Sequence, residues 1–373
     1  MVLKNEKLND TLLWVFVVFS GFYINLFYIK PVYIAVFLGI IGYIFFEMKT
    51  FKNITWDKLS IFTIIWIVYM SISFIFIRGY IGTTLNSIMS VFTYFIGVQY
   101  LKNRDENRIL KISRDFINIS IILLIVEAAI RISHPRVYDL SFYRYKFNSI
   151  MYEDSNYVGI FIICLIFYSI YLSKYKSEKY IWQKIVLFLL CIATFSRAAI
   201  ISTLGMIIAL KIFDILYNIA KKLTKKQKIT ISIIMGLITI IICFLVVDFL
   251  LRDGSFRSKF YIAELAIKHL KHSNLNQILF GVGFGKTYDY IGIGAHNIVI
   301  AYTLESGIIG LIFFIMFTVM IAIKTNGKSL IITIPFLMAG MSLAGFTLPF
   351  LYIIYAMIYI LENERGRLDS YEQ

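Results

Sequence analysis

The sequence is short of charge, proline and cysteine. Charged residues make up 16% of its 373 positions and hydrophobic residues 59%, whereas a soluble domain usually has about 25% charged and about 45–50% apolar residues. With only 4 prolines, a proline-rich linker architecture is excluded. The three cysteines, Cys164, Cys191 and Cys243, lie in apolar runs without a Cys-x-x-Cys pair, so we expect neither a disulfide framework nor a zinc site. This composition argues against a soluble enzyme.

The composition is instead typical of a membrane protein. The mean hydropathy is +0.78, and aromatic residues reach 17%, which suits lipid-facing and interfacial surface. A net charge of +15 would indicate nucleic acid as the partner of a soluble protein. Here, however, Lys and Arg lie in short loops between apolar runs, where they set membrane orientation. We therefore expect no nucleic-acid partner.

The apolar runs predict an all-α polytopic membrane protein with about twelve transmembrane helices, since a helix needs about 20 mostly apolar residues to cross a bilayer. The two runs around Arg197 could form one long kinked helix or two helices joined by a tight turn. The predicted spans are Thr11–Tyr28, Pro31–Phe46, Leu59–Ile77, Thr84–Leu101, Phe116–Ile130, Asn156–Ser173, Ile185–Phe195, Ala199–Tyr217, Thr230–Leu250, Ile298–Ile323, Leu330–Leu343 and Leu348–Leu361.

Charge in the connecting segments predicts how the chain crosses the membrane. If the N-terminus is cytoplasmic, 24 of the 37 Lys and Arg residues fall on the cytoplasmic side and 13 on the other. Cytoplasmic loops carry an excess of Lys and Arg, so we expect both termini inside, including the polar tail 362–373. The first residues lack the cleavage site of a signal peptide. We expect a single integral membrane domain over residues 1–373.

Polar residues gather in two extracytoplasmic loops, 131–155 and 251–297. Both are too long to be simple connections, and long loops without a span are usually functional or disordered. In the second loop, which precedes the tenth span, residues Arg257–His272 have the period of an amphipathic helix. Such a helix could lie in the outer membrane interface or form a lid. Its predicted apolar stripe is Phe260, Ala263, Ile267 and Leu270, and its polar stripe is Arg257, Tyr261, Glu264 and Lys268.

Three features after this helix have residue types suited to binding anions or moving protons. The run Gly281-Val-Gly-Phe-Gly-Lys286 predicts a tight glycine turn, in which Lys286 and backbone N–H groups such as that of Gly283 could hold a phosphate oxygen. His296-Asn297 stands where the loop enters the next span, a natural place for a proton acceptor near neutral pH. Glu305 lies inside that span, where a carboxylate indicates either a functional site or an ion pair.

Arginines next to the membrane need an anionic partner. Arg197 lies between two apolar runs, and an arginine in a bilayer costs about 2.5–3.5 kcal/mol on insertion scales. We therefore expect a carboxylate or an anionic ligand beside it. Arg252 and Arg257 lie in the long second loop. Glu127 and Arg131 are four residues apart, which favours a structural ion pair over a functional role.

Together these features resemble the O-antigen polymerase and O-antigen ligase family of bacterial envelope enzymes. His296-Asn297 followed by Gly307-Ile-Ile-Gly310 is similar to the family's His-Asn…Gly-x-x-Gly signature, and Phe280–Gly285 resembles the glycine pattern before it. Ser196-Arg197 also resembles a family segment. So does Asp154-Ser-Asn-Tyr157, although the family usually has Asn-Pro-Asn there. The resemblance covers most of the chain in hydropathy and in the large outside loop.

The resemblance implies glycosyl transfer at the outer face of the bacterial plasma (inner) membrane. The donor would be a glycan on undecaprenyl diphosphate, with no metal ion, nucleotide sugar or other cofactor. A polymerase passes the glycan to another lipid-linked repeat unit of O-antigen or capsule, and could work with a chain-length regulator protein. A ligase passes it to the lipid A core of lipopolysaccharide. We favour the polymerase, because a composition rich in Ile, Lys, Asn, Tyr and Phe is one we associate with laterally acquired surface-polysaccharide gene clusters. A lipid-glycan transporter is the alternative of a different class, but it would be expected to show polar signals in both halves.

Within that reaction the residues would have distinct roles. Arg197 and Arg257, with Arg252 as an alternative to Arg257, would bind the diphosphate through their planar forks and stabilise its growing charge. His296 is the expected general base for the acceptor hydroxyl. The apolar spans would hold the polyprenyl tail among the membrane lipids. The expected substrate-binding residues are Arg252, Asn297, Glu305, Gly283 and Lys286.

The charge bias can be tested by cysteine labelling. In a background without the three native cysteines, Lys225→Cys and Lys268→Cys are probed with a membrane-impermeant thiol reagent on intact cells. We expect labelling at position 268, because it lies in the predicted extracytoplasmic loop 251–297. We expect none at position 225, because it lies in a predicted cytoplasmic lysine cluster. The opposite pattern would invert the predicted topology.

Overall fold

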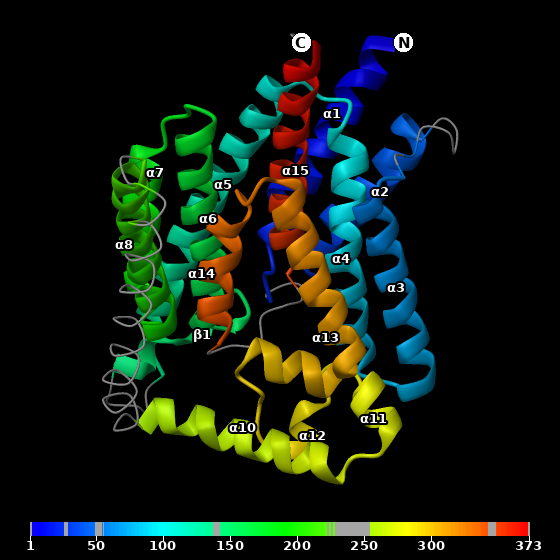
Figure 1. The fold of residues 1–373 in the computed structure, drawn as a ribbon, viewed down its shortest axis with the longest axis vertical. Helices are drawn as coiled ribbons and strands as arrows, with labels where there is room; N and C mark the ends of the chain where they lie inside the picture. Colours follow the sequence, from blue (N-terminus) through cyan, green and yellow to red (C-terminus); the bar gives the residue numbers. More distant parts are fainter. Residues whose placement is uncertain are drawn as a thin grey trace.

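A computed structural model describes residues 2–25, 29–48, 54, 56–136, 142–221, 224, 227, 254–341 and 348–371. It is a bundle of long helices joined mostly by short connections (Figure 1). The helices are α1 (Val2–Val18), α2 (Pro31–Gly42), α3 (Lys58–Ile77), α4 (Ile81–Leu101), α5 (Glu106–Ser133), α6 (Ser155–Tyr175), α7 (Ile181–Ala193), α8 (Arg197–Ala220), α10 (Gly254–His272), α11 (Leu275–Phe280), α12 (Thr287–Ile291), α13 (Ile298–Lys324), α14 (Leu330–Gly340) and α15 (Pro349–Tyr371).

The bundle has two unlike ends. The start of α1 and the end of α15 lie together at one end, which we call the terminal end (Figure 1). Helices α10, α11 and α12 lie at the opposite end, which we call the loop end. A short antiparallel ribbon of β1 (Phe147–Ser149) and β2 (Glu153–Asp154) is also at the loop end. Besides this ribbon, an isolated antiparallel β-bridge joins Ile24 and Met151.

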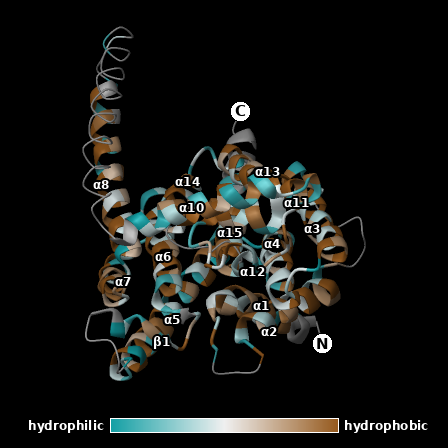
Figure 2. Cartoon of the chain, turned by 90° about the horizontal axis from the view of Figure 1, so that it is seen from below, coloured by the Kyte–Doolittle hydropathy of each residue, from teal (hydrophilic) through white to brown (hydrophobic). Residues whose placement is uncertain are grey.

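Six helices are long and apolar enough to cross a membrane: α3, α4, α5, α6, α8 and α13. Large apolar side chains such as Phe76 and Trp182 point outward and are 81% and 76% exposed. Figure 2 shows hydrophobic residues over the outward-facing surfaces of the helices. Soluble monomers rarely expose apolar surface on this scale, so the exterior fits a bundle surrounded by lipid.

Each predicted span that has described residues contains a helix, but several boundaries differ. Helix α1 begins at Val2 rather than Thr11 and ends at Val18 rather than Tyr28. Helix α5 begins at Glu106, where the Asp105 carboxylate accepts a hydrogen bond from the Arg108 N–H. Hydropathy marks only the apolar part of a helix, whereas caps decide where the backbone begins and ends.

Two further expectations concern the middle of the chain. The apolar runs around Arg197 form two helices, α7 and α8, joined by a tight turn over residues 194–196. The predicted span Thr230–Leu250 lies outside the described residues. Five further predicted spans contain helices that are not among the six long apolar ones. The first contains α1, and the others contain shorter apolar helices over Pro31–Glu47, Ile181–Ala193, Leu330–Gly340 and Pro349–Asn363.

The centre of the bundle is formed by α6 and α15. In the most apolar stretch of α6, 83% of the residues are buried, compared with 22% in α8. Phe161 of α6 packs on Phe350 of α15, with ring centroids 4.6 Å apart. The ring of Phe161 also lies against Gly21, where a Cβ atom would be only 2.2 Å from it. Helix α6 is therefore fixed in the core, and residues at its loop end are attached to a rigid element.

Ion pairs are concentrated at the terminal end. The buried pair Glu127–Arg131 lies toward the opposite end, in the last turns of α5. The pairs at the terminal end are Arg104–Asp10, Arg104–Glu47, Arg108–Asp10, Arg114–Glu178, Lys174–Asp214, Lys176–Glu106 and Lys328–Glu362.

Helix α13 bends at Gly307, which has the non-helical angles φ +68° and ψ −178°. A bend leaves carbonyl groups without their helical partners. The glycine turn after α11 supplies two donors: the Val282 N–H lies 2.8 Å from the Leu304 oxygen, and the Gly283 N–H lies 3.0 Å from the Glu305 oxygen. The loop end is thus joined to α13 through backbone hydrogen bonds.

Gly281 provides a test of this joint. Its φ is +81°, and a Cβ atom there would lie 2.5 Å from the backbone carbon and oxygen of Glu305. We expect Gly281→Ala to lower the free energy of unfolding by more than about 1 kcal/mol, because both the backbone conformation and the close approach require glycine. Unfolding is followed in detergent. Gly82→Ala is the control, since nothing lies within 4 Å of a Cβ atom at that position. Equal midpoints for the two variants would contradict the prediction.

Candidate functional site

Three charged residues from separate elements come together at the loop end. Lys146 precedes β1, Asp154 ends β2, and Arg197 begins α8. The ribbon places Phe147 opposite Asp154, and the Ser155 N–H donates to the Lys146 carbonyl over 3.0 Å. The charges of Asp154 and Arg197 both act on the Lys146 amine. These three residues form what we call the loop-end charge cluster.

Helix caps fix two members of this cluster. The Asp154 carboxylate accepts hydrogen bonds from the backbone N–H of Asn156 at 2.8 Å and from its side-chain amide at 3.0 Å, and so caps α6. The Ser196 hydroxyl oxygen accepts from the Ala199 N–H at 3.3 Å and caps α8. Arg197 is therefore the first residue of α8, where unpaired N–H groups of the helix add positive potential.

Burial and two neighbouring charges act on the pKa of Lys146. Burial lowers the pKa of Lys146, the positive charge of Arg197 lowers it further, and the Asp154 carboxylate opposes both effects. Because Arg197 is exposed, an anionic group from outside has access to it. The sequence alone identified Arg197, whereas Lys146 was counted only as a charge outside the membrane.

His296 and Asn297 occupy the entrance of α13. His296 is exposed and has a φ of +38°, a left-handed conformation that is uncommon outside glycine. Its ring packs beside Gly294, where a Cβ atom would lie 3.1 Å from Nε2. The Asn297 side-chain oxygen accepts from the N–H groups of Val299 and Ile300 at 2.9 and 3.1 Å. This oxygen caps α13 and is already engaged within the protein.

Glu305 faces the glycine turn rather than a cation. Its carboxylate accepts a hydrogen bond of 2.8 Å from the Thr287 hydroxyl and further bonds from the backbone N–H groups of Gly285 and Thr287. The N–H of Gly283 is taken by the Glu305 carbonyl. Backbone N–H groups of the glycine turn, which were expected to hold a phosphate oxygen, thus bind Glu305 instead. Lys286 is partly buried next to the turn.

Helix α10 is amphipathic, and the face that it buries lies outside the predicted apolar stripe. Ile262 and Ala266 are buried against Ile291 and Leu304. Of the predicted stripe, Phe260 and Ile267 are 51% and 54% exposed. Apolar residues therefore lie on two faces of this helix, and the face with Ile262 and Ala266 packs against α12 and α13.

The remaining predicted residues lie apart from these groups. Arg257 is exposed on α10, and Arg252 lies outside the described residues. Within the described ranges, no group of three or more His, Cys, Asp and Glu side chains is arranged to hold a metal ion. The loop end thus brings Arg197 together with Lys146 and Asp154, while His296 lies at the start of α13 and Arg257 on α10.

No protein-family model matches the sequence, and no curated protein sequence is significantly similar to it. The family resemblance therefore rests on the short motifs quoted above.

The influence of Arg197 on Lys146 can be measured directly. The rate of Lys146 acylation by an amine-reactive reagent is followed between pH 7 and 11 by peptide mass spectrometry. Only the neutral amine reacts, so a higher pKa means slower acylation at a given pH below it. We expect Arg197→Gln to raise the pKa of Lys146 and slow the reaction, and Asp154→Asn to lower it and speed the reaction.

Exposed Lys111 at the terminal end serves as the internal control, with an unchanged rate in both variants. Shifts of the same sign in the two variants would contradict the described arrangement of charges.

Proposed function

We propose that this protein polymerises undecaprenyl-diphosphate-linked oligosaccharide repeat units at the outer face of the bacterial plasma membrane. The loop end would lie outside and both termini in the cytoplasm. The observation that carries the proposal is the pair of cations Arg197 and Lys146 at the end of an apolar helix bundle. A polyprenyl diphosphate needs this combination, because its tail stays in lipid while its diphosphate requires cationic donors nearby.

The proposed reaction exchanges one bond at the anomeric carbon of the donor sugar. The acceptor hydroxyl attacks this carbon, and the bond from the carbon to the diphosphate oxygen breaks. The diphosphate leaves with the bonding electrons, and Arg197 stabilises its growing charge. His296, exposed at the loop end, takes the proton of the attacking hydroxyl. The products are a lengthened lipid-linked glycan and undecaprenyl diphosphate.

The test is polymerisation with a single substrate. Purified protein in detergent or liposomes is incubated with lipid-linked repeat units alone, and the products are separated by gel electrophoresis. We expect a ladder of glycans that differ by one repeat unit. A product that forms only after addition of lipid A core would instead identify a ligase. Transport of the lipid-linked units across the liposome membrane without a new bond would identify a transporter.

Variants connect the ladder to the proposed residues. We expect His296→Ala to lower the rate of ladder formation about 10²–10⁴-fold, which is the usual contribution of a general base. Arg197→Lys should also lose most activity, since a point charge replaces the planar fork. His134→Ala is the matched control, because His134 is another exposed histidine at the loop end. Near-normal turnover by His296→Ala would end its assignment as the base.

A further inference from the structure

The buried ion pair near the loop end has an unusual set of partners. Arg131 and Glu127 of α5 are 0% and 1% exposed, and Nε of Arg131 lies 2.7 Å from Oε1 of Glu127. This confirms the structural pair expected from their spacing. Nη2 of Arg131 also donates to Oε2 of Glu127 over 3.4 Å. Because arginine has five N–H donors, both terminal nitrogens still have N–H groups for other acceptors.

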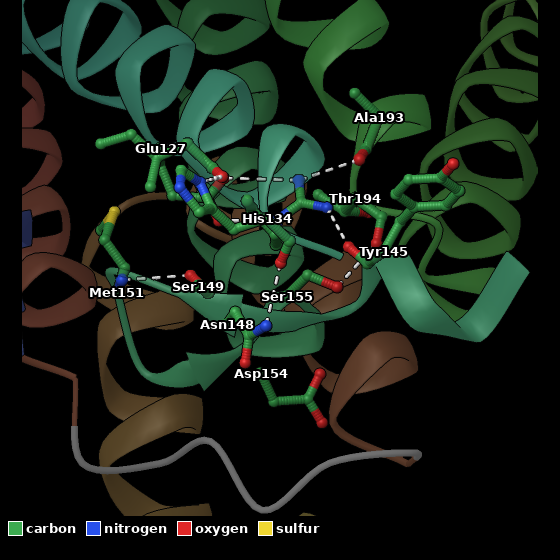
Figure 3. A network of polar contacts seen from close by, with 12 residues as sticks. Glu127, His134, Tyr145, Asn148, Ser149, Met151, Asp154, Ser155, Ala193 and Thr194 are labelled. Carbon is green, nitrogen blue, oxygen red and sulfur yellow. Dashed lines mark hydrogen bonds and ion pairs between the residues drawn. The ribbon is translucent and has the colours of Figure 1, made fainter. Parts of the chain in front are cut away.

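These nitrogens bind the two chain segments that carry the cations of the charge cluster. Nη1 of Arg131 donates to the Tyr145 carbonyl at 2.5 Å, and Nη2 donates to the Ala193 carbonyl at 2.9 Å (Figure 3). Tyr145 directly precedes Lys146, and Ala193 ends α7 just before the turn that leads to Arg197. One guanidinium therefore holds both segments.

Two further contacts join the same segments. The Ser155 hydroxyl donates to the Thr194 carbonyl at 2.6 Å, next to the Arg131 contact (Figure 3). The ring of Tyr145 stacks on that of Phe195, with centroids 5.5 Å apart. The turn before α8 is thus fastened from α5 by Arg131 and from α6 by Ser155. Helix α8 itself is mostly exposed, so its own packing contributes less to the position of Arg197.

We propose that Arg131 is a positioning residue that holds Arg197 and Lys146 side by side, so that both cations act on one anionic group. Two neighbouring cations repel each other, and their segments would separate without a common anchor. Lysine cannot replace Arg131, because one ammonium group cannot match the fork that reaches a carboxylate and two carbonyls at once. That the anion is a lipid diphosphate rests on the proposed function, whereas the positioning does not.

The test uses the acylation of Lys146 as a reporter that is independent of catalysis. Lys146 is acted on by Asp154 and Arg197, so withdrawal of Arg197 raises its pKa. In Arg131→Lys, which keeps the charge opposite Glu127, we expect acylation of Lys146 at pH 9 to slow severalfold, toward the rate in Arg197→Gln. The double variant Arg131→Lys with Arg197→Gln should show no further slowing, because both changes act through Arg197.

The matched control is Lys176→Met at the terminal end. Lys176 is also a buried cation that binds a carboxylate, Glu106 at 2.8 Å, and a backbone carbonyl, Leu361 at 2.7 Å. Its loss should lower stability without changing the acylation of Lys146. If Arg131→Lys does not fold, Ser155→Ala removes the second fastening, and we expect a smaller shift in the same direction. An unchanged Lys146 profile in a folded Arg131→Lys or Ser155→Ala protein would overturn the proposal.

Polymerisation assays on the same proteins separate this proposal from the proposed function. We expect Arg131→Lys to lower the rate of ladder formation at least tenfold at normal protein level. A shifted Lys146 profile with no ladder from the unsubstituted protein would leave the positioning intact and reject the polymerase. A normal ladder together with an unchanged Lys146 profile in Arg131→Lys would reject the positioning and keep the polymerase.

Discussion

Backbone carbonyls that leave a helix inside an apolar bundle must find a donor within the protein, because lipid offers none. This constraint accounts for the hydrogen bonds at two places in the loop end. At the end of α7, Arg131 and Ser155 donate to the carbonyls of Ala193 and Thr194. At the bend of α13, the glycine turn donates to the carbonyls of Leu304 and Glu305. In both places the groups that satisfy the backbone also fix the position of a candidate functional residue.

The two solutions differ in the chemistry they use. A charged side chain reaches across from α5 to the turn before Arg197, and its cost of burial is offset by Glu127. The bend of α13 relies on backbone N–H groups instead, which is feasible because Gly281 lets the glycine turn approach the Glu305 backbone closely. Glu305 then takes the remaining N–H groups of Gly285 and Thr287. A carboxylate expected to bind substrate is therefore part of the scaffold in this conformation.

The sequence predicted the positions of the helices well, because long apolar runs are a strong and local signal. It also found the Glu127–Arg131 pair from a spacing of four residues. It could not find the partnership of Lys146 and Arg197, which lie 51 positions apart and meet through a two-stranded ribbon and a helix turn. The buried face of α10 was missed for a related reason: its choice depends on the partners Ile291 and Leu304, and not on its own period.

The bend at Gly307 also sets the length of the part of α13 that follows it. Beyond it, α13 continues to Lys324, which at 1.5 Å per residue is about 26 Å. The hydrocarbon core of a bilayer is about 30 Å thick, so this segment nearly spans the core without extending far past it. If this segment crosses the core, residues 298–306 before the bend reach the level where hydrocarbon gives way to headgroups. Under the proposed function, the lipid-linked substrate would meet the entrance of α13 with its diphosphate in the headgroup layer and only its glycan in water.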